Sequence, residues 1–178
     1  MGSVGNSDTQ KYLDVPLTNG TTYYIWFDTW PTPDSPCPGT FSIDIAPPAA
    51  VNDEPCTAIA VPVGSSCSFV TYNNANGTSS AGIPTPSCSS YAGGDVWYSF
   101  VVPTSGNVVI NLDTVPNPTY VDYAMSLYVG TCDALTEIDC DDDSGNGLMP
   151  MLSETGLTPG DSIWIRVFTF NNPAGGDF

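Results

Sequence analysis

The sequence contains no histidine and only two basic residues, Lys11 and Arg166, against 19 acidic residues, which gives a formal net charge of −17. The absence of histidine excludes Ser-His-Asp triads, Cys-His dyads and histidine-ligated zinc sites. The shortage of basic side chains excludes nucleic acid as a partner, because its backbone is bound through several Lys or Arg contacts. Partners are expected among cations, neutral glycans and basic protein surfaces, unless the charge serves solubility alone.

Long apolar runs and helix signals are also missing. No stretch of about 18 apolar residues occurs, so the sequence predicts no membrane insertion. Seventeen Gly and 17 Pro separate short runs rich in Val, Ile and aromatic residues, a pattern typical of an all-β, antiparallel, jelly-roll-like β-sandwich. Strands are expected at residues 22–27, 39–45, 68–72, 95–101, 107–112, 123–128, 135–139 and 162–170.

Catalytic motifs find little support. Neither a phosphate-binding loop nor a dinucleotide fingerprint is present. The composition permits glycoside hydrolysis by two carboxylates, but Glu54, Glu137 and Glu154 lie in no recognisable motif for it. The sequence therefore predicts a protein that is not an enzyme.

The six cysteines indicate an oxidising location, secreted or at the cell surface. Six cysteines allow fifteen pairings, so most of the connectivity stays open. Cys132 and Cys140 flank a short acidic segment and are expected to staple a hairpin. Cys67 with Cys88 is the next choice, which leaves the other two cysteines unassigned.

The chain contains an internal repeat. Residues 17–30 match residues 157–170 at an offset of 140, and residues 39–41 match residues 176–178 after a three-residue difference in loop length. A self-match at a fixed offset is typical of tandem modules.

Three segments follow from this repeat. We expect residues 1–45 to be the C-terminal strands of a preceding module, residues 46–51 to be a Pro-rich linker, and residues 52–178 to be a second module that lacks its last strand. A neighbouring copy is then expected to supply that strand in a head-to-tail array or filament. The alternative is that the sequence is an excerpt from a longer repeat protein, whose next residues supply it.

Six motifs occur in order in the second module: NDEPC (52–56), DVWYSF (95–100), VPTSG (102–106), YVGTC (128–132), CDDD (140–143) and LTPG (157–160). In this order they resemble the pre-peptidase C-terminal-like and CUB-like β-sandwich modules of secreted multidomain proteins from Bacteroidetes-type bacteria. The resemblance implies an extracellular module, often in tandem, attached to proteases or adhesins and exported by type IX secretion. Such modules usually end in a Cys where this sequence has Asp44, so the pairing of Cys56 is left open.

Residues 139–147 hold the densest acidic cluster. Calcium takes six to eight oxygen ligands from carboxylates, amides and backbone carbonyls. A calcium ion (Ca2+) is therefore expected on Asp139, Asp141, Asp142, Asp143 and Asn146. The resemblance adds Asp122, because CUB-like modules are similar in placing an Asp at the head of the strand that is expected here at residues 123–128. The alternative is a solvated loop that binds nothing, but clustered carboxylates raise one another's pKa, which favours a cation.

Two other groups have alternative interpretations. Tyr24, Trp26 and Trp30 form a possible platform for stacking on a glycan, or part of a core. Asp95 is expected to cap a turn beside a core Trp97, or else to contribute to an acidic site. The expected function is that of a non-catalytic, calcium-stabilised repeat module of a large secreted surface protein, an adhesin or filament building block. The alternative is an accessory glycan- or protein-binding domain of a secreted protease.

Overall fold

The computed structural model describes residues 17–18, 21–25, 48–88, 90–116, 118, 120–173 and 175–178, and the chain divides into two units, 1–45 and 46–178. In the first unit, the Thr21 N–H donates to the carbonyl of Thr18 (3.2 Å). Residues 22–25, expected to begin a strand, are not part of one. The expected strand at residues 39–45 lies outside the described residues.

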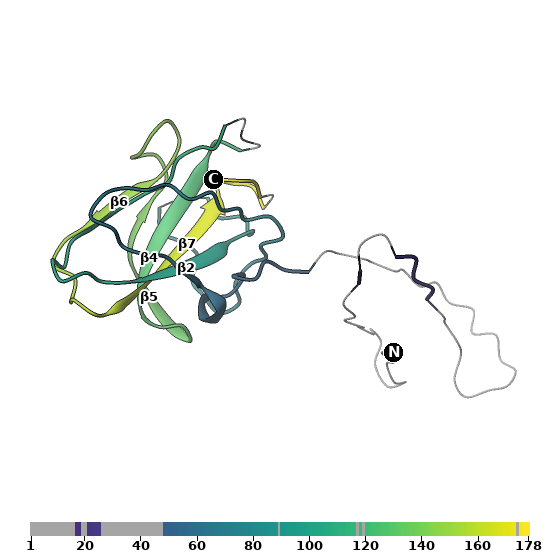
Figure 1. The fold of residues 1–178 in the computed structure, drawn as a ribbon, viewed down its shortest axis with the longest axis horizontal. Helices are drawn as coiled ribbons and strands as arrows, with labels where there is room; N and C mark the ends of the chain where they lie inside the picture. The colour runs from purple at the N-terminus through teal and green to yellow at the C-terminus, as the bar shows by residue number, and fades with distance from the viewer. Residues whose placement is uncertain are drawn as a thin grey trace, which may run out of the picture. The chain divides into compact units, whose positions relative to one another are not determined.

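The second unit consists of two β-sheets (Figure 1). Its elements are η1 (Pro55–Thr57), β1 (Ile59–Ala60), β2 (Val96–Val101), β3 (Val108–Asn111), β4 (Tyr123–Thr131), β5 (Ala134–Asp141), β6 (Met151–Glu154) and β7 (Ser162–Thr169). The larger sheet has the order β1-β2-β7-β4-β5, and the smaller sheet pairs β3 with β6. Among the strand pairs of the described residues, the short β1–β2 pair is parallel and the other four are antiparallel. The predicted all-β sandwich is confirmed.

β7 lies between β2 and β4 (Figure 1). Its side chains alternate between two buried faces. Ile163, Ile165 and Val167 belong to the core shared with the smaller sheet. Because successive side chains of a strand point to opposite faces, Arg166 and Phe168 lie on the other face. They are buried as well, so the larger sheet is covered on both sides.

The second face is covered by an irregular segment between residues 74 and 95. The Trp97 indole N–H donates to the hydroxyl of Ser80 (2.7 Å), and Arg166 Nη1 donates to the carbonyl of Pro84 (3.0 Å). A disulfide from Cys88 to Cys140 fastens this cover to β5. A second disulfide, Cys56–Cys132, ties η1 to the turn between β4 and β5.

These disulfides correct both expected pairings. Cys132 lies in the β4–β5 turn and Cys140 near the far end of β5, so the residues between them form an extended strand. At about 3.3 Å per residue, eight residues of strand separate the two cysteines by roughly 26 Å, far beyond disulfide reach. The Cys67–Cys88 pairing is wrong because Cys88 bonds to Cys140, and the Cys67 thiol is free and exposed.

The predicted strands are partly confirmed. The five expectations at 95–101, 107–112, 123–128, 135–139 and 162–170 coincide with β2, β3, β4, β5 and β7 within three residues at each end. The expected strand at 68–72 does not form, and β1 and β6 were not predicted. In the part of the chain that the structure describes, no helix has the length and apolar character needed to cross a membrane.

Candidate functional site

The acidic loop that follows β5 is organised by Asp141. Its Oδ2 accepts hydrogen bonds from the backbone N–H groups of Ser144 (3.0 Å) and Met151 (2.8 Å), and its Oδ1 accepts one from the Ser144 hydroxyl (2.6 Å). The Gly145 N–H donates to the carbonyl of Met149 (2.7 Å), and a Cβ at Gly145 would lie 2.6 Å from that oxygen. Asp141 and Gly145 therefore fix the shape of the loop.

The head of β4 lies against this loop. Asp122 forms a parallel bridge with Leu148, and the Tyr123 N–H donates to the Leu148 carbonyl (3.4 Å). Partial burial raises the pKa of the Asp122 carboxyl, and the charges of Asp143 and Asp142 raise it further. The structure thus brings Asp122 near the loop, and its role as a calcium ligand stays a prediction.

Asp142 is under the same electrostatic pressure. Partial burial raises the pKa of its carboxyl, followed by the charges of Asp143 and Asp141, while backbone hydrogen bonds oppose the rise. The single basic residue among the described residues, Arg166, is buried and paired elsewhere. The carboxylates of this loop therefore repel one another without a nearby positive side chain.

A further carboxylate, Asp113, joins the site and was missed by the sequence analysis. The side-chain amide of Asn146 donates to Asp113 Oδ1 (3.2 Å) from across 33 residues of sequence. An amide that donates through its nitrogen keeps its oxygen as a possible cation ligand. No sequence signal singles out Asp113, because only the packing of the residues after β3 against the loop brings it there.

Asp139 interacts with a second carboxyl group, that of Glu154 on β6. Burial raises the pKa of the Glu154 carboxyl, and a hydrogen bond with Asp139 and the charge of Asp139 raise it further. Asp139 is not among the causes that raise the pKa of Asp122 or Asp142. Asp139 and Glu154 therefore form a carboxyl pair, and the role of Asp139 as a calcium ligand stays a prediction.

The donor set of the loop suits a hard cation. It offers carboxylate, amide and backbone carbonyl oxygens, the ligands that calcium prefers. Among the described residues, only Cys56, Cys132 and Asp133 bring three acidic or cysteine ligand atoms within 4.8 Å of one another, and those two sulfurs are joined in a disulfide. The loop carboxylates are thus close enough to interact by charge. Their oxygens lie farther apart than the ligand atoms that surround one bound ion.

A buried ion pair lies on the covered face of the larger sheet. Arg166 Nε donates to Asp95 Oδ2 at 2.9 Å, and both side chains are 0% exposed. The guanidinium also lies over the rings of Tyr91 (4.3 Å to the centroid) and Trp97 (5.4 Å). Asp95 is therefore part of the core and not of the acidic site, while Trp97 is buried as predicted.

The predicted glycan platform is described only in part. Tyr24 is 94% exposed, while Trp26 and Trp30 lie outside the described residues. Their joint role stays a prediction.

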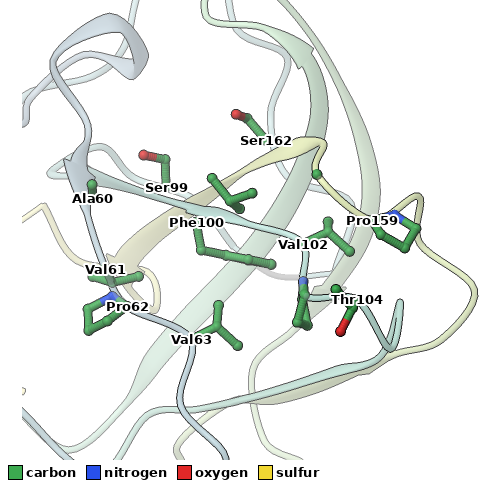
Figure 2. A pocket seen from close by; sticks show the side chains of 13 residues that line it. Ala60, Val61, Pro62, Val63, Ser99, Phe100, Val102, Thr104, Pro159 and Ser162 are labelled. Carbon is green, nitrogen blue, oxygen red and sulfur yellow. The ribbon is translucent and has the colours of Figure 1, made fainter.

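A neutral apolar groove of about 680 Å³ lies at the end of β2 (Figure 2). Val63, Phe100 and Val102 supply apolar walls, and Pro159 closes one side. None of the residues that line the groove carries a charge, so it has no acid or base for catalysis.

A family model described as galactose binding domain-like, from a group associated with type IX secretion, matches residues 51–177, which is more than half of the chain. No curated protein and no solved structure matches.

Proposed function

The chain belongs to the galactose binding domain-like family associated with type IX secretion, and from this premise we propose that it is a calcium-stabilised, non-catalytic repeat module of a surface protein. The family and the two disulfides place the module in a secreted, extracellular protein. Galactose-binding-like domains are binding modules and are typically non-catalytic. The adhesin or filament role, the calcium ion and the closer kinship to pre-peptidase C-terminal-like modules are our proposals.

The mutual repulsion of Asp122, Asp142 and Asp143 carries the calcium proposal. Their carboxyl groups come from two separate parts of the chain, and the raised pKa values of Asp122 and Asp142 mean that their charges are unfavourable in the folded protein. A divalent cation would remove this repulsion. These residues, with Asn146 and Asp113, would hold it between the head of β4 and the loop after β5.

Thermal unfolding with and without a chelator tests this proposal. Calcium at 100 times its dissociation constant should stabilise the folded state by about 2.7 kcal/mol, because it binds the folded loop preferentially. Asp142→Asn should weaken this response, while Asp161→Asn removes the same charge from an exposed residue outside the loop and should leave it intact. Identical melting curves in chelator and in calcium would show that the loop binds no calcium.

The groove in Figure 2 favours a second role, that of an accessory binding domain. Its neutral, apolar walls and its size are typical of sites for small neutral ligands or for apolar protein side chains. Binding to neutral glycans, measured by calorimetry, should be lost in Val63→Asp, which places a charge in the groove. Tyr24→Ala distinguishes the groove from the aromatic platform. It should weaken glycan binding to the platform and leave glycan binding in the groove unchanged.

The internal repeat supports an array of like modules. Two copies of the same segment in one chain indicate that modules of this kind follow one another, and each is expected to contact its neighbour. Sedimentation of the chain over a range of concentrations tests whether such modules associate.

A further inference from the structure

The described part of the chain contains two Asn-Gly sequences, at residues 76–77 and 146–147. An asparagine before glycine loses its side-chain amide more readily than other asparagines, because glycine has no side chain to shield its backbone nitrogen. That nitrogen must lose its proton and reach the Cγ atom of the asparagine. A hydrogen bond from the glycine N–H, or a rigid backbone, therefore prevents the reaction, so the structure decides which of the two sequences can react.

Asn146 and Gly147 form the tip of the acidic loop. The Gly145 N–H donates to the carbonyl of Met149 (2.7 Å), which closes the base of this tip. Asn146 and Gly147 are both exposed, and within the described residues the Gly147 N–H donates no hydrogen bond. Gly147 has a φ of +69°, and no atom would lie within 4 Å of a Cβ there. The backbone nitrogen of Gly147 is therefore unbonded, in an exposed turn that leaves it room to move.

The other Asn-Gly sequence is held on both sides. The Gly77 N–H donates to the carbonyl of Asn74 (3.0 Å), and the carbonyl of Asn76 accepts a hydrogen bond from the Ala50 N–H (3.1 Å). A Cβ at Gly77 would lie 2.7 Å from a neighbouring backbone oxygen, so the chain is closely packed there. The same dipeptide is thus bound at residues 76–77 and free at the tip of the loop.

We propose that Asn146–Gly147 is a self-modifying site, at which the asparagine of the folded protein converts to aspartate and isoaspartate. The Gly147 nitrogen gives up its proton and forms a bond to Asn146 Cγ, the Cγ–Nδ2 bond breaks, and ammonia leaves. Water then adds to either carbonyl of the resulting succinimide ring, and one ring C–N bond breaks. Overall, an amide and a water molecule give a carboxylate and an ammonium ion, and no enzyme, cofactor or oxidant takes part.

This conversion would change the charge of the acidic loop. The Asn146 amide donates to Asp113 Oδ1 at 3.2 Å. A carboxylate in its place has no proton to donate and faces Asp113 with a like charge, so an attraction becomes a repulsion. It also adds a negative charge to a loop that already holds Asp141, Asp142 and Asp143. The modified loop should therefore bind a cation more strongly, a consequence that rests on the proposed function, whereas the conversion itself does not.

Site-resolved mass spectrometry tests the conversion. The whole chain, with its disulfides intact, is incubated with chelator in mildly alkaline buffer, which favours the deprotonated backbone nitrogen. A second sample is reduced and unfolded in urea under the same conditions. A protease that cleaves after aromatic residues then places Asn76 and Asn146 in separate peptides, and also separates Asn19, which lies outside the described residues.

In the folded protein, Asn146 should show the mass change of amide to acid, with isoaspartate among the products, while Asn76 keeps its amide. In urea, both asparagines should convert at similar rates. The inference is overturned if Asn146 stays intact in the folded protein over a time in which the unfolded chain converts. Equal conversion of Asn76 and Asn146 in the folded protein would overturn the structural selection on which it rests.

Two glutamine variants test the attack by the Gly147 nitrogen. Asn146→Gln keeps an amide, but its longer side chain would have to close a six-membered ring, so residue 146 should stay unmodified. The matched control, Asn76→Gln, should leave the conversion of Asn146 unchanged. Conversion of Asn146→Gln at the rate of the wild type would point to direct hydrolysis by solvent and would contradict the succinimide route.

Calcium distinguishes this inference from the proposed function. If the Asn146 amide oxygen binds the ion, calcium should slow the conversion, because the amide and the loop tip are then held in place. Asn146→Asp, which mimics the product, should melt at a lower temperature in chelator and gain more from calcium than the wild type. Conversion that calcium does not slow would leave the modification in place and contradict Asn146 as a calcium ligand. Absence of conversion in chelator would contradict the modification, whatever calcium does to the melting curves.

Discussion

Removal of either partner of the Arg166–Asp95 pair should destabilise the module, and by different amounts. Without Arg166, the Asp95 carboxylate still accepts hydrogen bonds from the Ser80 N–H and hydroxyl, the Tyr91 hydroxyl and the Trp97 indole. Breaking a buried pair costs about 3–5 kcal/mol. Because these donors continue to solvate the anion, Arg166→Met should fall at the lower end, about 3 kcal/mol.

The change Asp95→Asn should cost more, about 5 kcal/mol, because the cation loses its carboxylate. Arg166 then keeps the Pro84 carbonyl at 3.0 Å and the two aromatic rings. The new amide NH2 would also face donors that now point at a carboxylate oxygen. Arg166→Lys should be intermediate, since it keeps the charge but loses the planar contact with the rings.

Urea unfolding with the disulfides intact, followed by tryptophan fluorescence, measures these free energies. The double variant Asp95→Asn, Arg166→Met removes both charges and should be more stable than Asp95→Asn alone. The reasoning is refuted if Arg166→Met costs more than Asp95→Asn, or if the double variant costs the sum of the two.

Two further predictions concern pH and the disulfides. In chelator, the raised pKa values of Asp122 and Asp142 mean that the folded state binds protons more readily than the unfolded state. Protonation of the loop should therefore stabilise the fold as the pH falls toward about 4, and this contribution should be lost as the pH rises. Saturating calcium should reverse this response, and melting curves of the wild type and Asp142→Asn against pH will measure it. Replacing Cys88 and Cys140, which are 52 residues apart, by Ala should cost about 4 kcal/mol in the loop-entropy model, and a loss below 1 kcal/mol in urea unfolding would contradict the fastening role of this disulfide.

The strands that the sequence predicted correctly are those in which β-branched and aromatic residues dominate, such as β2 and β7. β6 was missed because Met151–Glu154 contains no β-branched or aromatic residue, and it forms a strand only through its pairing with β3. The segment 68–72 has a strand-forming sequence, but among the described residues only Tyr72 of this segment is paired, with Phe178. A strand is defined by its pairing, which local sequence does not contain.

The candidate site was predicted in part for a similar reason. Asp142 and Asp143 follow one another in the sequence, and the family resemblance located Asp122, whereas Asp113 and the Asp139–Glu154 pair depend on which strands lie side by side. The buried ion pair also has a signal in the sequence. Arg166 stands alone among apolar residues of β7, and a charge in such a strand requires a buried partner.

The burial of Arg166 also determines how well the folded module resists proteases that cleave after Lys or Arg. An enzyme that cleaves only after Lys or Arg has two targets in this sequence, Lys11 and Arg166, and residues 46–178 contain only the second. Because that side chain is 0% exposed in a central strand, the folded module offers such an enzyme no accessible bond. Cleavage after Arg166 therefore requires opening of the sheet, and its rate reports the population of opened molecules. A single arginine thus makes the module resistant to trypsin-like digestion and makes trypsin a one-site probe of its unfolding.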